Sequence, residues 1–122
     1  MQTPEAVPRF EESRGQLMLE LSNAVVRIHK EYHGKGPTKA RSHLSQDMLV
    51  VVLEGGYTHS EQTLLAAGHA KEVMQSRLAM QATTEPALRR AVEEILKRPV
   101  RSFMSAQDPN ADVQVEVFLL EA

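Results

Sequence analysis

The fold of this chain turns on one stretch, Tyr32-His33-Gly34-Lys35-Gly36-Pro37-Thr38-Lys39-Ala40-Arg41. Upstream of it, apolar residues recur at three- and four-residue steps, a spacing that places them on one face of a helix. Gly34 is the expected helix stop, because glycine takes the left-handed cap conformation without strain. From Thr38 the period changes to two, which is typical of a strand whose alternate residues point to opposite faces. The stretch therefore predicts a helix, a turn on two glycines and a strand with basic residues on one side.

Composition sets the class of protein. The chain has 122 residues, of which 42% are hydrophobic and 25% charged, and this is typical of one globular domain. A net charge of -2 argues against a dedicated nucleic-acid binder. The absence of cysteine excludes disulfides, thiolate catalysis and zinc or iron–sulfur ligation by cysteine, and suits a reducing cytosol. The longest apolar run, Met48–Leu53, is too short to cross a bilayer, and residues 1–7 do not resemble a signal peptide.

The first helix is expected to begin at Ser13. Ser13 and Gln16 have the spacing of a capping box, in which each side chain satisfies the other residue's free backbone donor. Residues 1–13, which include two prolines, then form a flexible leader. Residues 14–122 contain no internal repeat and no linker, and this predicts a single domain.

Two further helices are expected in the middle of the chain. A second capping box, Thr58–Glu61, opens a helix that runs to about Met80. Thr83-Thr84-Glu85-Pro86 is expected to stop this helix and to begin the next, because proline is tolerated in a first turn but not in a helix interior. The third helix ends before Pro99.

The strands are expected to form two hairpins. The strand that begins at Thr38 pairs with Met48–Leu53, and residues 100–105 pair with 113–120. The order α-β-β-α-α-β-β predicts an α+β fold, with a four-stranded antiparallel sheet and helices packed mainly on one face. The residues of the last strand that are expected to face the core are Val113, Val115, Val117 and Leu119. The residues then left on the opposite, uncovered face are Phe103, Phe118 and Leu120. A homodimer that buries this second face is therefore expected.

The loop at Gly34–Lys39 is the first candidate site. A phosphate-binding P-loop follows a strand and precedes a helix, whereas this loop follows a helix and leads into a strand. A helix cap and a turn account for its glycines and proline. The functional alternative is a cationic surface for a small anion, an acidic partner or an anionic lipid. The residues of this candidate site are Lys35, Gly36, Lys39, Arg41 and His43.

A second candidate loop lies between the apolar strand and the next helix, a position suited to an anion site. Its residues are Glu54, Gly55, Gly56 and Thr58. The loop lacks the G-x-G-x-x-G pattern of dinucleotide-binding proteins, and Thr58 together with Glu61 already accounts for the free donors of the helix. Helix capping is therefore favoured over ligand binding.

The sequence contains no recognisable set of metal ligands or catalytic residues. His29 and His33 lie four residues apart on one helix face, but no third ligand is evident. The loop Asp108–Asp112 imitates the start of a calcium loop and lacks the glycine and glutamate that such a loop requires, so a turn is expected. We expect no catalytic residue, no metal and no cofactor.

The chain also contains five segments of a recognisable pattern: Leu21–Val26, Glu31-Tyr32, Gly34–Ala40, Val50–Gly56 and Val115–Leu119. Together they resemble the MpsC (YbcI-like) family, a bacterial domain of unknown function. The resemblance covers residues 15–121 and leaves residues 1–14 outside. It implies an association with sodium-translocating, membrane-potential-generating systems and with inorganic-carbon uptake modules, and it supplies no catalytic residues.

From this resemblance and the basic strand we expect a non-catalytic accessory or regulatory subunit of a bacterial membrane ion or inorganic-carbon transport system. It would lie in the cytoplasm or against the inner face of the membrane. The alternative is a sensor that binds a small anion or a nucleotide between the Gly-Pro loop and Gly55-Gly56. A weak nucleic-acid binder is a further alternative, ranked last because aromatic residues make up 4% of the chain.

Overall fold

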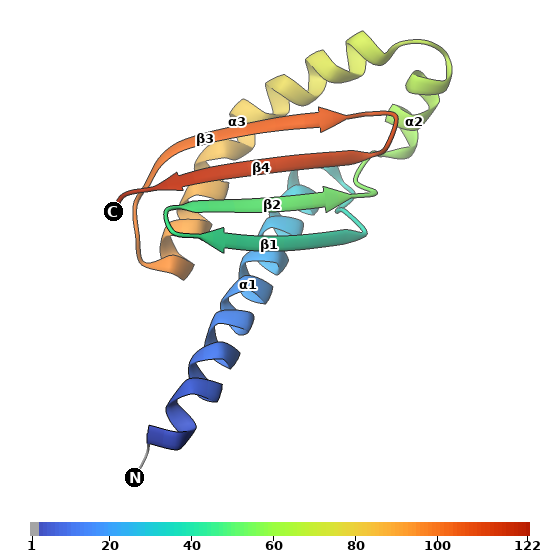
Figure 1. Ribbon diagram of the computed structural model, residues 1–122. Helices are drawn as coiled ribbons and strands as arrows, with labels where there is room; N and C mark the ends of the chain where they lie inside the picture. Colours follow the sequence, from blue (N-terminus) through green and yellow to red (C-terminus); the bar gives the residue numbers. More distant parts are fainter. Residues whose placement is uncertain (1–2) are drawn as a thin grey trace.

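The computed structural model of the protein describes residues 3–122, with side chains from Ser13 onward (Figure 1). Its elements follow the predicted order α-β-β-α-α-β-β. They are α1 (Thr3–His33), β1 (Lys39–Ser45), β2 (Met48–Glu54), α2 (His59–Ala66), α3 (Ala70–Leu96), β3 (Val100–Asp108) and β4 (Val113–Leu120).

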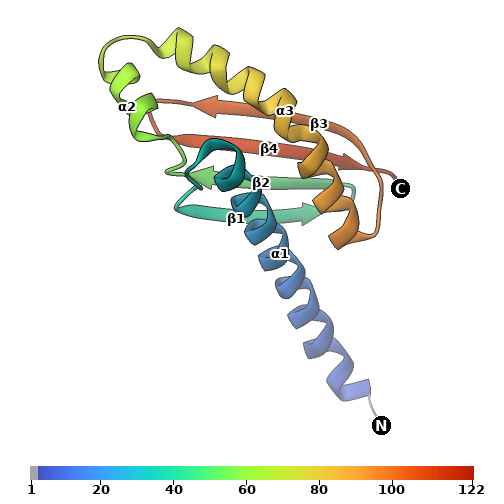
Figure 2. The same cartoon turned by 180° about the vertical axis from the view of Figure 1, so that it is seen from behind.

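The four strands form one antiparallel sheet in the order β1-β2-β4-β3. Helices α1 and α3 both lie against the same face of this sheet, and no described segment covers the other face (Figures 1 and 2). The predicted α+β class, the antiparallel pairing and the one-sided packing of the helices are therefore confirmed. We call the uncovered side of the sheet the open face.

Helix α1 ends as expected and begins earlier than expected. It stops at Gly34, which has a φ of 81° and donates its N–H to the carbonyl of Lys30 at 2.9 Å. Its start is Thr3 rather than Ser13, so Ser13 does not cap it, and the first turns project beyond the sheet where a leader was expected (Figure 1). Pro4 is compatible with this start because a first turn has no use for the missing N–H. Residues 1 and 2 of the expected leader lie outside the described residues.

The break between the second and third helices was wrongly placed. It lies at Gly68 and His69, where Gly68 has a φ of 88°, and Pro86 stands inside α3. Two hydroxyls bond to carbonyls in the turns before this proline: Thr83 Oγ1 to Ala79 O at 3.1 Å, and Thr84 Oγ1 to Gln81 O at 3.2 Å. The Thr–Thr–Glu–Pro segment therefore continues one helix rather than separating two.

The core lies between the helices and the covered face of the sheet. Its fully buried members come from α1, β2, α3 and β4: Leu21, Val25, Leu49, Val51, Leu88, Val92, Phe118 and Leu120. A fully buried Leu or Phe contributes about 1.5–3 kcal/mol to folding relative to an exposed one. The apolar stripe predicted for the first helix packs here, through Leu21, Val25 and Ile28.

The two faces of β4 are opposite to the prediction. Phe118 and Leu120 are 0% and 1% exposed and face the helices, because antiparallel register sets Phe118 beside Leu49. Phe103 packs against Phe118, with ring centroids 4.9 Å apart. The residues that were expected in the core lie on the open face instead. Together with their neighbours on β2 they form what we call the aliphatic centre: Met48, Val50, Val52, Val113, Val115, Val117 and Leu119.

Candidate functional site

The two candidate loops meet at the end of the sheet. The N–H of Thr38 donates to the carbonyl of Glu54 at 2.9 Å, and this bond begins the pairing of β1 with β2. Gly55 has a φ of 72°, and a Cβ at this position would lie 2.2 Å from Thr38 Oγ1, so a side chain has no room here. We call residues 34–38 and 54–58, taken together, the glycine junction.

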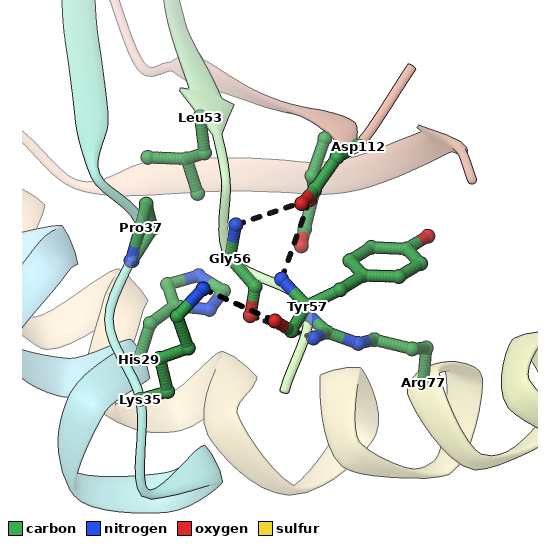
Figure 3. Close-up of a pocket in the computed structure, with 9 residues that line it drawn as sticks. His29, Lys35, Pro37, Leu53, Gly56, Tyr57, Arg77 and Asp112 are labelled. Atoms are coloured by element: carbon green, nitrogen blue, oxygen red, sulfur yellow. Dashed lines mark hydrogen bonds between the residues drawn. The ribbon is translucent and has the colours of Figure 1, made fainter. Parts of the chain in front are cut away.

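Lys35 is an internal tie of the glycine junction. Its ammonium donates to the carbonyl of Gly55 at 2.7 Å. It also donates to the carbonyl of Tyr57 at 3.1 Å (Figure 3). This side chain therefore holds one loop to the other, whereas the remaining predicted cations stand on β1. The structure brings Lys35 together with the second candidate loop and separates it from Lys39, Arg41 and His43.

Asp112 also holds the junction, a role that no sequence pattern indicates. Its Oδ1 accepts hydrogen bonds from the backbone N–H groups of Gly56 at 3.1 Å and Tyr57 at 3.3 Å (Figure 3). Its backbone carbonyl accepts from the N–H of Gly55 at 3.0 Å. The residue lies 55 positions further along the chain than Tyr57. From the sequence, Asp112 is expected only as part of the turn at Asp108–Asp112, because aspartate is common in turns. Its hydrogen bonds to Gly56 and Tyr57 become apparent only in the structure.

A buried ion pair closes the junction from the side of α3. The guanidinium of Arg77, whose side chain is 3% exposed, donates to both carboxylate oxygens of Glu61, with an Nε–Oε2 distance of 2.7 Å. It also donates to the carbonyl of Gly56 at 3.0 Å and lies 4.4 Å from the centre of the Tyr57 ring. Glu61 in turn completes the predicted capping box with Thr58. Thr58 is therefore a helix cap, as expected.

The charge of Glu61 is stabilised by these contacts. Burial alone would raise the pKa of this carboxyl, but the hydrogen bonds from Arg77 and Thr58 outweigh it and lower the pKa. The Arg77–Glu61 pair is therefore ionised at neutral pH. Each charge is shielded from water and needs the opposite charge beside it, so removing either partner should destabilise the fold.

The cavity between the two loops is small. It is lined by the basic groups of His29, Lys35 and Arg77 and by the carboxylate of Asp112 (Figure 3). Its volume is about 10 Å³, which is room for about one water molecule. Lys35, the one cation of the predicted anion site that lies here, thus shares with its neighbours the space in which a nucleotide would have to lie.

A wider hollow adjoins the ion pair on its outer side. It has a volume of about 210 Å³ and is lined by residues of α1, α2 and α3, among them Tyr32, His33, Glu61 and Arg77. His33 stacks on His29 with ring centroids 5.4 Å apart. Burial, the guanidinium of Arg77 and His29 lower the pKa of His33 from 6.5 to about 4, and Glu61 acts in the opposite direction.

We expect His33 to make the protein less stable in mild acid. Below pH 6.5 the unfolded chain takes up a proton on this imidazole, whereas the folded chain resists it down to about pH 4, so the free energy of unfolding falls as the pH drops through this range. Replacing His33 with glutamine should make that fall shallower. Urea unfolding of both proteins between pH 7.5 and 4.5 measures the difference, and parallel pH profiles would contradict the prediction.

A second buried polar cluster lies beneath the junction. His29, on α1, is 3% exposed, and its Nε2 lies 2.8 Å from Oε2 of Glu116, which is 1% exposed. Gln114 donates to the same carboxylate oxygen at 3.0 Å, while Glu116 Oε1 has no hydrogen-bond partner among the described residues. The predicted pairing of His29 and His33 on one helix face is correct, but Nε2 of His29 is engaged by a carboxylate. Among the described residues, no group of three histidine and acidic side chains is placed to hold a metal ion.

The basic strand lies as its alternation predicted. Lys39, Arg41 and His43 are exposed on the open face of β1, which is an edge strand of the sheet. Arg41 approaches Glu54 across the strands at 3.9 Å, with 56% of its side chain and 37% of that of Glu54 exposed. An exposed pair at this distance contributes less than about 1 kcal/mol, so the arginine remains accessible to other partners.

These features define an α+β domain whose polar junction serves chiefly to hold its own loops together, with a basic edge beside an aliphatic sheet face. Residues 13–122 match the family described as the Na+-translocating membrane potential-generating system (MpsC), and the chain belongs to this family. The uncharacterized protein YbcI of Bacillus subtilis strain 168 is 23% identical over 112 residues, which cover 91% of this chain and 90% of that protein. No solved structure matches the chain. Within residues 3–122, none of the helices is both long and apolar enough to cross a bilayer.

Proposed function

We propose that this protein is a non-catalytic accessory subunit of a membrane ion or inorganic-carbon transport system, and that it docks through the basic residues of β1. The observation that carries the proposal is the common outward orientation of Lys39, Arg41 and His43 on an exposed edge strand. The family description supplies the kind of system, because it names a sodium-translocating, membrane-potential-generating machinery. The docking partner is an acidic cytoplasmic surface of a transport protein.

The charge arrangement suits reversible docking. A row of exposed cations steers an acidic partner and raises the rate of association, and salt weakens this effect. Of the three basic residues of β1, only Arg41 has an acidic neighbour within ion-pair distance among the described residues. That contact, with Glu54, is long and exposed. The surface is therefore suited to a regulatory contact that forms and releases.

Charge reversal on β1 tests the proposal. The double variant Lys39→Glu/Arg41→Glu should co-purify with native membranes about tenfold less than the unchanged protein, because attraction becomes repulsion. Lys71→Glu/Arg90→Glu is the matched control, since both residues are exposed on α3 and the change in net charge is the same. Equal retention of all three proteins would overturn the proposal.

A second arm of the experiment identifies the partner. Binding of the unchanged protein to membranes should disappear after mild protease treatment of the membranes, and protein-free phosphatidylglycerol vesicles should not retain it. Equal binding to such vesicles would replace a protein partner with a lipid surface and would overturn this part of the proposal.

A sensor of nucleotides at the glycine junction has less support. The ammonium of Lys35 is already bonded to two carbonyls, and the cavity beside it has a volume of about 10 Å³. Nucleic-acid binding also has less support. The net charge is -2, and the exposed basic row consists of Lys39, Arg41 and His43 on one short strand.

A further inference from the structure

We infer that the open face of the sheet is the contact between two copies of this chain, packed sheet against sheet about a twofold axis that runs parallel to the strands. The inference goes beyond the proposed function, because it assigns the whole open face, with the aliphatic centre on β2 and β4 in its middle, to contact with a second copy of this chain. It corrects the residues of the homodimer predicted from the sequence, since Phe118 and Leu120 are buried within the subunit.

The open face is rich in aliphatic side chains, as is the face of a sheet that packs against a second sheet. Its two central strands present seven aliphatic side chains and Glu54, and β3 adds Met104 and Ala106. Met48 and Met104 are 43% and 47% exposed. Antiparallel sheets with one solvated face normally carry polar residues there, so this face is typical of the inner side of a two-sheet packing.

The register arranges the face in rows that run across all four strands. One outer row consists of Lys39, Glu54, Val113 and Asp108, and the opposite outer row of Ser45, Met48, Leu119 and Ser102. Directly paired residues point to the same face, so these rows can be placed against a copy of themselves. Lys39 and Asp108 lie at the two ends of the first row, on the edge strands β1 and β3, and Glu54 lies beside Lys39 on β2.

Charge complementarity selects the second copy and its orientation. With the twofold axis parallel to the strands, β1 of one subunit lies over β3 of the other, and each Lys39 meets the end of the sheet that carries the other subunit's Asp108. The same operation places the aliphatic residues of β2 over those of β4. With the axis across the strands, β1 would instead face β1, and the basic residues of the two subunits would repel one another.

A lipid surface fits the same face less well. Glu54 and Asp108 stand in one row with Lys39, so an anionic membrane laid on the open face would meet two carboxylates there. In the proposed dimer Lys39 of the second copy lies over Asp108, and Glu54 keeps its pair with Arg41 of the same subunit. In the dimer Lys39, Arg41 and His43 face β3 of the second copy, so dimerisation and the docking proposed above compete for the same side chains.

The oligomeric state of the full chain tests the inference. Sedimentation at micromolar concentrations should show a dimer, and Met48→Glu should raise the dimer dissociation constant about tenfold or more, because a carboxylate is then buried against aliphatic side chains. Leu19→Glu is the matched control: Leu19 is an apolar residue of α1, 61% exposed, this helix lies on the covered side of the sheet, and the substitution should leave the dimer intact. A monomeric unchanged protein, or equal effects of the two substitutions, would overturn the inference.

A charge exchange tests the orientation without altering the aliphatic centre. Lys39→Glu and Asp108→Lys should each weaken the dimer, and the double variant should restore it. Within one subunit the two residues lie on opposite edges of the sheet, roughly 14 Å apart at ordinary strand spacing, so restoration reports a contact between subunits. Failure of the double variant to restore dimerisation would overturn the orientation.

The two proposals fail separately. Met48→Glu leaves the basic residues of β1 unchanged, so loss of the dimer with retained co-purification would confirm a dimer that docking does not require. Conversely, Lys71→Glu/Arg90→Glu changes neither face, and it should remain dimeric and membrane-associated.

Discussion

Replacing Arg77 with methionine should lower the free energy of unfolding by about 3–5 kcal/mol, because it leaves the carboxylate of Glu61 without its partner in a poorly hydrated site. The substitution also removes the hydrogen bond to the carbonyl of Gly56 and the contact with the Tyr57 ring. Methionine keeps much of the apolar volume, so the loss reports the charge and the hydrogen bonds. Urea or guanidinium unfolding at pH 7 measures it.

Arg89→Met is the control for this prediction. Arg89 pairs with Glu85 at 2.8 Å, close to the 2.7 Å Nε–Oε2 distance of Arg77 and Glu61, but its side chain is 33% exposed whereas that of Arg77 is 3% exposed. Its loss should therefore lower the free energy of unfolding by about 1 kcal/mol or less. Similar effects of the two substitutions would show that burial does not set the strength of these pairs.

Replacing His29 with leucine should lower the free energy of unfolding by about 3 kcal/mol, because the carboxylate of Glu116 then remains buried with only Gln114 beside it. Replacing both partners, as His29→Leu/Glu116→Leu, should destabilise the protein less than His29→Leu alone. The second substitution removes a buried charge that has become unpaired, and the interior accepts hydrocarbon at that position.

A double-mutant cycle with Glu116→Leu completes the measurement. The two single losses should exceed the loss of the double variant, which gives a coupling energy of about 1–3 kcal/mol. If the losses add, the 2.8 Å contact between His29 and Glu116 contributes nothing to stability.

The sequence predicted the elements wherever the signal was local. The stripe of α1, its stop at Gly34 and the capping box at Thr58 each depend on residues within a few positions, and each is confirmed. The misplaced helix break has a physical cause as well. Pro86 indicates a boundary by itself, but tertiary packing of Leu88 and Val92 on the core favours one continuous helix, and packing can outweigh the cost of a proline.

The faces of β4 were not predictable from alternation alone. Either set of alternate residues in this strand could face the core, because valines occupy one set and Phe118 with Leu120 the other. In the structure Phe118 and Leu120 join the core, and Glu116 on the same face of β4 has a partner in His29, 87 positions away. A contact between residues so far apart in the sequence cannot be predicted from the alternation of residues within one strand.

The candidate site divides in the same way. The orientation of Lys39, Arg41 and His43 follows from the period of β1 and could be predicted. The capture of Lys35 by the carbonyls of Gly55 and Tyr57, and the part played by Asp112, depend on three loops meeting in space. Composition and spacing do not encode such a meeting.

The buried side of β4 changes character along its length. Phe118 and Leu120 lie at one end among hydrocarbon, whereas Gln114 and Glu116 lie at the other, near the ion pair of Arg77. Protonation of a carboxylate removes the contribution of its ion pair to stability, whereas the free energy of burying hydrocarbon hardly depends on pH. The ion pair of Glu61 with Arg77 at the glycine end is therefore weakened when the pH falls through the lowered pKa of Glu61, whereas the burial of Phe118 and Leu120 at the opposite end does not depend on pH.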